Sequence, residues 1–455
     1  MAKIYEHTPS PPRTSKQYHR SLASVRSLCS AQLRKIKRSR RSEKVKFDGV
    51  EFAASELFST YFQFVAERHQ IFLRRYDGQP QPWTDDPILA AYPFTNVFRV
   101  LDRNSQYILQ NVIQKGSQDL HEAFFRVLLF RTFNKIETWE FLEENLGAIT
   151  WKDFNLQTYD RVLSSVDGAV YNSVYIMPAP GRAFGFDRNY LNHLRLIDLM
   201  MAEKLADELQ QMKHLKDAHG RLTLGVNEIF TPVLDFFRLI LDLNMMPHFN
   251  WSEDEWVAVG PGSKSCLHKM FGSDVAGHEE AAMRFIRDEQ FKYFKKYGVD
   301  TVEIPRLCPE RRPGLTMVDI EHSLCECEKY SRARFPELKG KRVRVGLPYV
   351  AKDLPVTLVI PTNWLTCPLS SPQYSQPPPL DDNDTYEVSH IVKEKVTGHY
   401  IVRWLGWGPT DDTVVSEANL SEGSMELVAQ WKKMKQKIAD GIEKRCKQDR
   451  EIRTQ

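Results

Sequence analysis

Long apolar runs are missing from the sequence. No stretch approaches the roughly 18 consecutive apolar residues that a membrane-spanning helix needs, so we expect no membrane partner. The first residues are basic and polar and lack an apolar segment that would direct secretion. Cysteine is scarce: there are seven, an odd number at scattered positions. We therefore expect a reducing compartment and no disulfide framework.

Nucleotide and metal motifs are missing too. The string Gly262-Ser-Lys-Ser does not have the Gly-Lys-Ser/Thr spacing of a P-loop, and no Rossmann fingerprint is present. His322, Cys325 and Cys327 lie close in sequence, but no second Cys/His pair lies near them. We therefore expect no ATP-dependent kinase activity, no cofactor and no metal.

Composition divides the 455 residues into segments. With 42% hydrophobic and 27% charged residues, most of the chain can bury a core. Apolar residues recur at helical spacing from Phe58 to Phe72 and over residues 118–142, 192–216, 228–243 and 278–297. The predicted segments are a disordered basic tail (1–46), a helical unit (47–366), a proline-rich linker (367–384), a small sheet module (385–437) and a charged helix or tail (438–455).

Positive charge is concentrated at the N-terminus. Residues 1–46 contain 13 Lys and Arg but only Glu6 and Glu43 as acids, a local charge of +11 in a chain of net charge +3. The rest of the chain therefore has a net charge of −8. The overall charge does not indicate nucleic-acid binding, and only the basic N-terminal segment does. One basic run within this segment consists of Arg34, Lys35, Lys37, Arg38, Arg40 and Arg41. It predicts a nuclear localisation signal or a phosphate-binding arm, and the alternative is a solvated tail with no such function.

The C-terminal module has the pattern of a small antiparallel sheet. Apolar and polar residues alternate over residues 386–392 and 399–407, which predicts two strands. A turn and a third, short strand are expected next, and the pattern over residues 424–437 predicts an amphipathic helix. Tyr386-Glu-Val, Tyr400-Ile-Val-Arg-Trp-Leu-Gly-Trp and Glu417-Ala-Asn-Leu resemble the motifs of chromodomains.

The chromodomain resemblance implies a reader of histone tails. It places a cage for methylated lysine at Tyr386, Trp404 and Trp407, and aromatic faces attract a quaternary ammonium group. It also implies that the histone tail adds as an extra strand. Val414 stands where the family commonly has Trp. The alternative is that these aromatics only form the core and rim of a small barrel.

Polar residues gather among aromatics in the first part of the helical unit. Asn96, Arg99, Asp102 and Arg103 follow one another at helix-like offsets, so one helical face could present all four. The alternative is a structural salt-bridge network. Gly260 and Gly262, with Lys264, lie between two expected helices (251–259 and 265–270). A turn of this kind holds DNA phosphate in a helix–hairpin–helix, and the alternative is an ordinary helix cap.

Longer matches relate this unit to a known family. Trp83-Thr-Asp-Asp-Pro, Phe94-Thr-Asn-Val-Phe-Arg and Asp319-Ile-Glu-His-Ser-Leu-Cys-Glu resemble the helical domain found with phage 5-hydroxymethyl-deoxyuridine DNA kinases. That group is also described as alpha-glutamyl/putrescinyl thymine pyrophosphorylase-like, and related proteins are described as DNA base hypermodification proteins. The resemblance implies a mainly α fold related to helix–hairpin–helix glycosylases.

The same resemblance implies the residues that would act on a modified pyrimidine flipped out of DNA. Asp319 or Glu321 would be the acid–base group and His322 would carry or orient a proton. Asn96 and Asp102 complete the expected catalytic set. The expected DNA contacts are a stacking Trp83 and phosphate contacts from Arg99, Arg103, Gly260, Gly262 and Lys264.

Together these features predict a nuclear protein that couples a DNA base-hypermodification domain to a chromodomain, with DNA and a histone tail as partners. A non-catalytic chromatin adaptor, or a DNA- and chromatin-binding protein derived from a mobile element, is the alternative. A third possibility is a helix–hairpin–helix DNA binder that has lost its pocket.

Overall fold

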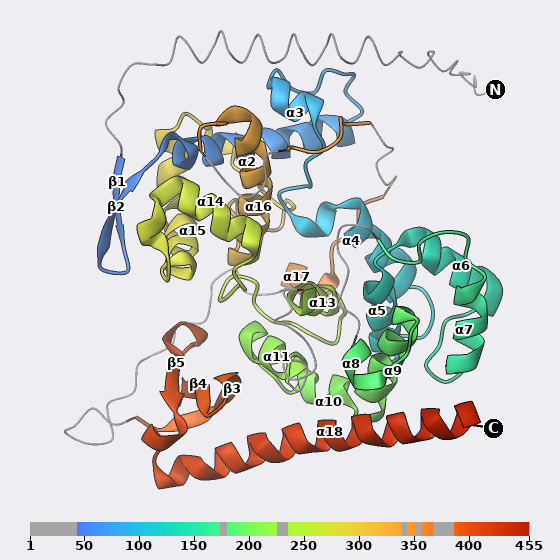
Figure 1. Ribbon diagram of the computed structural model, residues 1–455. Coiled ribbons are helices and arrows are strands. Elements are labelled where there is room, and N and C mark those ends of the chain that lie inside the picture. Colours follow the sequence, from blue (N-terminus) through green and yellow to red (C-terminus); the bar gives the residue numbers. More distant parts are fainter. Residues whose placement is uncertain are drawn as a thin grey trace, which may run out of the picture.

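A computed structural model describes residues 43–172, 180–224, 235–338, 344–350, 357–366 and 386–454. The part described is mainly helical, with a two-stranded hairpin near its start and a three-stranded antiparallel sheet near its end (Figure 1). The predicted localisation signal lies outside these residues. None of the helices described is long and apolar enough to cross a membrane.

The hairpin consists of β1 (Glu43–Phe47) and β2 (Val50–Ala54), joined at Asp48 and Gly49. Asp-Gly suits this two-residue turn because both residues have positive φ, 50° and 74°. Alternate side chains face inward, and Phe47 packs against Phe271 and Phe285. The expectation of disorder is therefore wrong for residues 43–46, because they belong to a strand.

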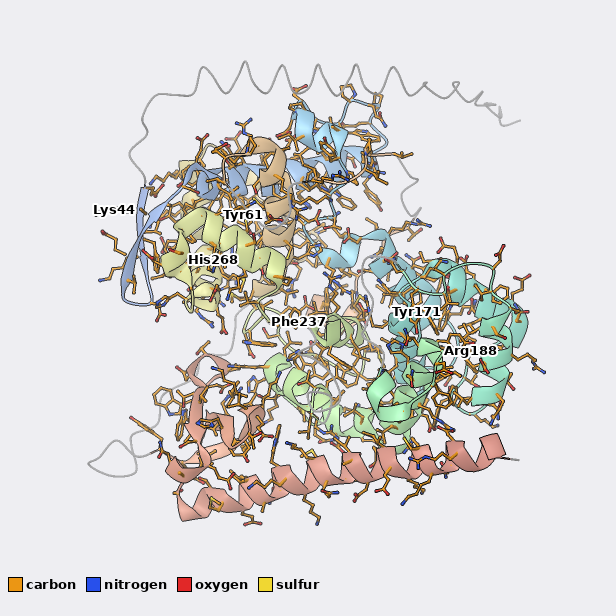
Figure 2. The ribbon with its side chains drawn as sticks, in the orientation of Figure 1. Lys44, Tyr61, Tyr171, Arg188, Phe237 and His268 are labelled. Atoms are coloured by element: carbon orange, nitrogen blue, oxygen red, sulfur yellow. The ribbon has the colours of Figure 1, made fainter. Side chains whose placement is uncertain are left out.

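A first lobe packs four long helices together. They are α2 (Glu56–Tyr76), α14 (Pro261–Phe271), α15 (Glu279–Lys296) and α16 (Met317–Arg334), with the short α3 (Pro87–Ala91) beside them. Tyr61, labelled in Figure 2, is fully buried in this lobe, and its hydroxyl lies 2.8 Å from Ser323 Oγ. The expected helices over residues 58–72 and 278–297 are thus present.

A second lobe contains the remaining helices, and two of the long helices expected there are interrupted. The region 118–142 is divided at Asn134, whose φ of 47° ends a helix, and the region 192–216 is broken first at Lys204, with φ of 55°. The resulting helices are α5 (Leu120–Phe133), α6 (Ile136–Leu146), α7 (Leu156–Ser164), α8 (Gly181–Phe184), α9 (Asn189–Ala202), α10 (Leu205–Gln210), α11 (Leu215–Leu222) and α13 (Asp235–Leu243).

Two local expectations are wrong. Residues 95–103 do not form one helix, because η1 (Arg99–Leu101) ends at Asp102, where the extended backbone separates it from α4 (Arg103–Tyr107). Residues 251–259 contain a turn at residues 253–255 and no helix. Gly260 therefore caps α14 with no helix before it, so no helix–hairpin–helix forms at this position.

Short elements complete the helical unit. The π-helix η2 (Ile108–Ile113) continues from α4, whereas η3 (Ser273–Val275) and η4 (Thr301–Glu303) flank α15. The last described element before the C-terminal module is α17 (Thr362–Thr366), which lies beside α13 in Figure 1. Trp364 fixes it there, since its indole N–H donates to the Asn244 carbonyl over 3.1 Å.

The C-terminal sheet has the order β3 (Val388–Val396), β4 (His399–Trp404) and β5 (Thr413–Ser416). The short η5 (Pro409–Asp411) lies between β4 and β5, and η6 (Glu417–Asn419) and η7 (Glu422–Ser424) follow β5. The expected terminal helix does not stop near residue 437. It continues as α18 (Met425–Thr454) along the second lobe (Figure 1), where Arg445 pairs with Asp198 over 2.7 Å.

A buried ion-pair cluster, the module latch, joins the sheet to α11. Its members are Asp217, Lys216 and His390 with Arg403 and Asp412. Arg403 of β4 donates to Asp217 of α11 over 2.9 Å and also pairs with Asp412. Lys216 lies 2.9 Å from Asp412, and His390 lies 3.3 Å from Asp217. The sheet module is therefore seated on the helical unit through charge as well as through apolar packing.

Candidate active site

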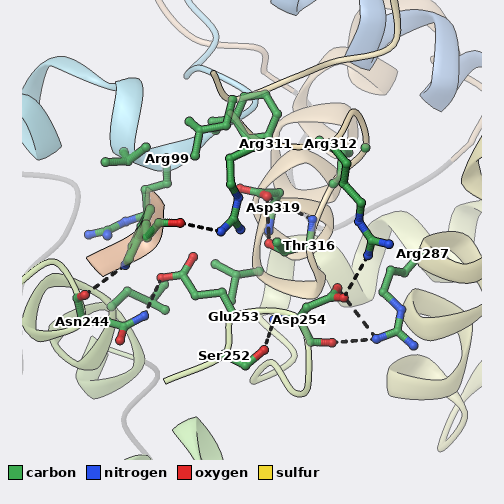
Figure 3. Close-up of a pocket in the computed structure, with 18 of the residues that line it drawn as sticks. Arg99, Asn244, Ser252, Glu253, Asp254, Arg287, Arg311, Arg312, Thr316 and Asp319 are labelled. Carbon is green, nitrogen blue, oxygen red and sulfur yellow. Dashed lines mark hydrogen bonds and ion pairs between the residues drawn. The ribbon is translucent and has the colours of Figure 1, made fainter. Parts of the chain in front are cut away.

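A cavity of about 390 Å³ lies where η1, the end of α13, α15 and the N-terminus of α16 meet (Figure 3). Carboxyl and guanidinium groups face one another across it. Of the residues predicted to act on DNA, Arg99 and Asp319 line it. Its other charged or amide lining residues are Asn244, Asn250, Glu253, Asp254, Arg287, Asp288, Gln290, Arg311 and Arg312.

Asp319 is held in place by the start of its own helix. As the third residue of α16 it forms a capping box with Thr316, whose backbone N–H and hydroxyl donate to Asp319 Oδ2 over 3.0 and 2.7 Å. No described hydrogen bond uses Oδ1. Burial raises the pKa of Asp319 to about 6, even though the Thr316 hydrogen bonds favour the charged form. One carboxyl oxygen thus serves the helix and the other is left for the cavity.

Glu253 supplies a second carboxyl group with an altered pKa. Loss of hydration, followed by the negative charge of Asp319, raises its pKa to about 7. Asn244 donates to Glu253 Oε1 over 3.1 Å, and the Val318 N–H donates to the Glu253 carbonyl over 3.1 Å. The start of α16 therefore positions both carboxyl groups. Two cavity acids that exchange protons near neutral pH are typical of a site for general acid–base chemistry.

Arginines surround this pair. Asp242, fully buried, holds Arg99 and Arg131 together in an ion-paired triad, which fixes Arg99 at the cavity wall. Arg311 donates to the Trp364 carbonyl over 2.8 Å and has no carboxylate within 4.0 Å among the described side chains. Figure 3 shows its guanidinium directed toward Glu253 and Asp319. An anionic ligand group would find unused N–H donors there.

His322, Asn96 and Asp102 form a separate network next to the cavity. His322 Nε2 lies 3.0 Å from Thr95 Oγ1 and 3.7 Å from Asp102 Oδ2, and the Asn96 N–H donates to Asp102 over 2.6 Å. Burial lowers the pKa of His322, but Asp102 and the nearby glutamates outweigh it and raise the pKa above its usual value. The structure brings these three predicted residues together, although none of them lines the cavity.

Glu321 and the predicted glycines meet where α14 crosses α16. Glu321 Oε1 accepts from the Gly260 N–H over 3.2 Å and from the Ser263 hydroxyl over 2.9 Å. A Cβ on Gly260 would lie 2.4 Å from that oxygen, and one on Gly262 would lie 2.8 Å from Cys325 Sγ. The glycines here permit close helix packing. Lys264 points elsewhere and pairs with Glu279 over 2.9 Å.

The other predicted DNA contacts lie apart from the cavity. Trp83 lines a second cavity of about 110 Å³, where the Arg75 guanidinium lies 4.9 Å from its ring centroid. Arg103 is exposed on α4. Among the described residues, no group of three His, Cys, Asp or Glu side chains is arranged to hold a metal ion.

The predicted aromatic cage residues do meet. The Tyr386 ring centroid lies 5.3 Å from that of Trp407 and 6.5 Å from that of Trp404, with both rings steeply inclined to Tyr386. The Trp404 indole N–H donates to Thr413 over 3.0 Å. Val414, at the position noted in the sequence, is 46% exposed and therefore not a core residue.

Comparison with known proteins identifies the helical unit. The family model of the 5-hmdU DNA kinase helical domain matches residues 55–340, more than half of the chain. The chain belongs to this family. The predicted resemblance is therefore confirmed for the helical unit. The family region contains every predicted catalytic residue, whereas the three-stranded sheet and α18 lie beyond it.

A curated relative is known from a phage. The 5-hmdU DNA kinase of Bacillus phage SP10 is 25% identical over 318 residues, which cover 63% of this chain and 47% of the relative. The chain thus spans about half the length of that relative. No solved structure matches the chain.

Sequence reasoning missed Glu253 and Arg311. Both lie inside the family region, in Trp251-Ser-Glu-Asp-Glu and in Glu310-Arg-Arg-Pro-Gly. The sequence feature that could have pointed to these two residues is the cluster of charged residues next to Trp in one segment and Gly in the other, where no helical periodicity is present. The expectation of a helix over residues 251–259 concealed it, because charged residues on a helix are usually a solvated face.

Proposed function

We propose that the helical unit binds DNA and acts on a modified pyrimidine in it, using the cavity that contains Glu253 and Asp319. The observation that carries this proposal is the pair of carboxyl groups with pKa values near 7 and 6, facing arginines in an open cavity. Membership of the 5-hmdU DNA kinase helical-domain family supports DNA base hypermodification as the setting.

The different pKa values assign different roles to the two acids. At neutral pH Asp319 is mostly ionised and suits the role of general base, whereas Glu253 is about half protonated and can donate a proton. Arg311 would hold an anionic substituent or a phosphate beside them. His322 lies one turn after Asp319 and would position the start of α16 through its contacts with Thr95 and Asp102.

We do not extend the kinase activity of the phage relative to this chain. The sequence has no P-loop spacing around Gly262, and the aligned part covers 47% of the relative. The proposal therefore concerns the helical domain alone.

Nucleoside mass spectrometry tests the proposal. Duplexes with and without 5-hydroxymethyl-deoxyuridine are incubated with the protein, with Asp319→Asn and Glu253→Gln, and with Asp274→Asn, an exposed residue outside the cavity, as control. Wild type and control should change the modified nucleoside, and each cavity variant should slow the change at least 100-fold. An unchanged nucleoside pool with wild type would reject the enzyme in favour of the non-catalytic adaptor.

We further propose that the sheet module binds a histone tail carrying methylated lysine and that the protein is nuclear. Support comes from the clustering of Tyr386 with Trp404 and Trp407, because aromatic faces attract a methylated ammonium. Titration of trimethyl-lysine histone peptides should give binding that Trp404→Ala and Trp407→Ala each weaken about tenfold. Val396→Ala, at an exposed site on β3, serves as control. Equal binding by all four proteins would reject the cage.

A further inference from the structure

Phe291 is an exposed aromatic side chain at the mouth of the Glu253–Asp319 cavity. It lies on α15, where the apolar residues Met283, Ile286 and Phe294 are fully buried. Phe291 is 45% exposed and lines the cavity. No other described aromatic ring is stacked on it. Exposed aromatics cost solubility, so one placed at the edge of a polar cavity points to a ligand with a flat face.

The loop that contains Gly314 lies beside this ring. Gly314 has a φ of +107°, and a Cβ there would lie 3.1 Å from Phe291 Cζ. Gln290, the preceding residue, accepts from the Leu315 N–H over 2.7 Å and donates to the Leu315 carbonyl over 3.1 Å. This two-point contact ties the loop to α15, so the edge of the Phe291 ring is supported while part of its surface stays open.

Cationic side chains flank the ring. Arg287 precedes Phe291 by four residues, which places both on the same face of α15, and it donates to the Asp254 carbonyl over 2.6 Å. Arg312, which also lines the cavity, has a side chain that is 58% exposed, and its ion pair with Asp254 is long, at 3.8 Å. Arg312 is therefore available to an external anion, whereas Arg287 is held by the protein.

An aromatic face, an exposed guanidinium group and a cavity with protonatable acids match the parts of one nucleotide. We propose that Phe291 stacks on the base of a DNA nucleotide entering the cavity and that Arg312 binds the phosphate beside it. This inference rests on the proposed function and adds the two residues that would hold an unpaired nucleotide at the cavity.

Fluorescence anisotropy with two labelled oligonucleotides tests the stacking. One single strand carries 5-hydroxymethyl-deoxyuridine at its centre, and the other carries an abasic site there. Phe291→Ala should weaken binding of the base-containing strand about tenfold and leave the abasic strand unchanged, whereas Phe291→Trp should retain wild-type binding. Val302→Ala, which removes an apolar group 90% exposed outside the cavity, is the control and should change neither.

A parallel measurement tests the phosphate contact. Arg312→Gln should weaken binding of both strands and reduce the salt dependence by about one counterion, whereas Lys295→Gln, exposed on α15 outside the cavity, should not. Circular dichroism confirms that each variant is folded. Equal losses with both strands in Phe291→Ala, no loss at all, or no binding by wild type would each overturn the inference.

The proposed function can fail separately. If Phe291→Ala selectively weakens binding of the base-containing strand while wild type leaves the nucleosides unchanged, the stacking proposal is supported and the catalytic proposal is rejected. If Phe291→Ala converts the nucleosides as fast as wild type does, the catalytic proposal is supported and the stacking proposal is rejected.

Discussion

Glu253 and Asp319 are held in surroundings that disfavour their charged forms. A carboxyl group whose pKa is raised in the folded state binds its proton more tightly there than in the unfolded chain. Its contribution to stability is complete at a pH below the unfolded value and is lost as the pH rises through the folded value. For Glu253 this loss falls between about pH 4.5 and 7. The cavity therefore keeps the pair at the expense of stability in neutral solution.

Replacing Glu253 with Gln should remove this penalty. The amide cannot ionise and can still accept the hydrogen bond from Asn244. The variant should be more stable than wild type by about 3 kcal/mol at pH 8 and within about 0.5 kcal/mol of wild type at pH 4.5. Urea unfolding at a series of pH values measures the difference. A gain that is the same at every pH would show that Glu253 does not titrate in this range.

The sequence alone singled out Asp319 but not its partner. Asp319 belongs to a long motif shared with the family, whereas Glu253 lies in irregular backbone that no periodicity marks. Similarly, helix-like spacing grouped Asn96, Asp102 and Arg103, but the chain turns at Asp102 and sends Arg103 outward. Proximity across the fold, here between residues 253 and 319, depends on tertiary packing that spacing cannot reveal.

At the scale of elements, the crossing of α14 over α16 determines where Asp319 and Glu321 lie. The two helices approach closely because Gly260 and Gly262 lack side chains at the contact. The sequence pattern predicts the presence of a helix correctly where apolar periodicity is strong, as for α2 and α15. Breaks at Asn134 and Lys204 were missed, because a non-glycine residue with positive φ leaves little trace in a pattern.

The Gly262→Ala substitution tests this close approach. Its Cβ would lie 2.8 Å from Cys325 Sγ and 3.3 Å from the Cys325 Cα, so the helices must separate. We expect a loss of about 1 to 3 kcal/mol in the free energy of unfolding. Gly423→Ala, where no atom lies within 4 Å of the added Cβ, is the matched control. Chemical denaturation measures both, and equal stabilities would contradict the packing role.

At the scale of the whole molecule, the sheet module is docked on the helical unit and is not a free tether. The sequence predicted the module and the helix after it but not the module latch, because Asp217 and Arg403 are 186 residues apart. The latch and the contacts of α18 with α9 hold the aromatic cluster at a fixed offset from the cavity. The histone and DNA binding that we propose would then be geometrically coupled.

Opening the latch should expose the module. Asp217→Ala leaves the side chain of Arg403, 3% exposed, without its partner on α11, which should weaken docking by on the order of 3 kcal/mol. Hydrogen exchange should accelerate in β3–β5 and remain unchanged in α2. Lys44→Ala, which removes a pair with both side chains more than half exposed, is the control. Unchanged exchange in the sheet would show that the latch does not hold it.

We propose that Glu253 and Asp319 carry protons for chemistry on a modified pyrimidine. The pH dependence of nucleoside conversion tests this role, with 5-hydroxymethyl-deoxyuridine duplex as substrate and mass spectrometry as readout. The rate should rise with a group of pKa about 6 and fall with a group of pKa about 7, and Glu253→Gln should abolish the fall. A profile that is flat between pH 5 and 8, or that keeps both limbs in Glu253→Gln, would contradict the claim.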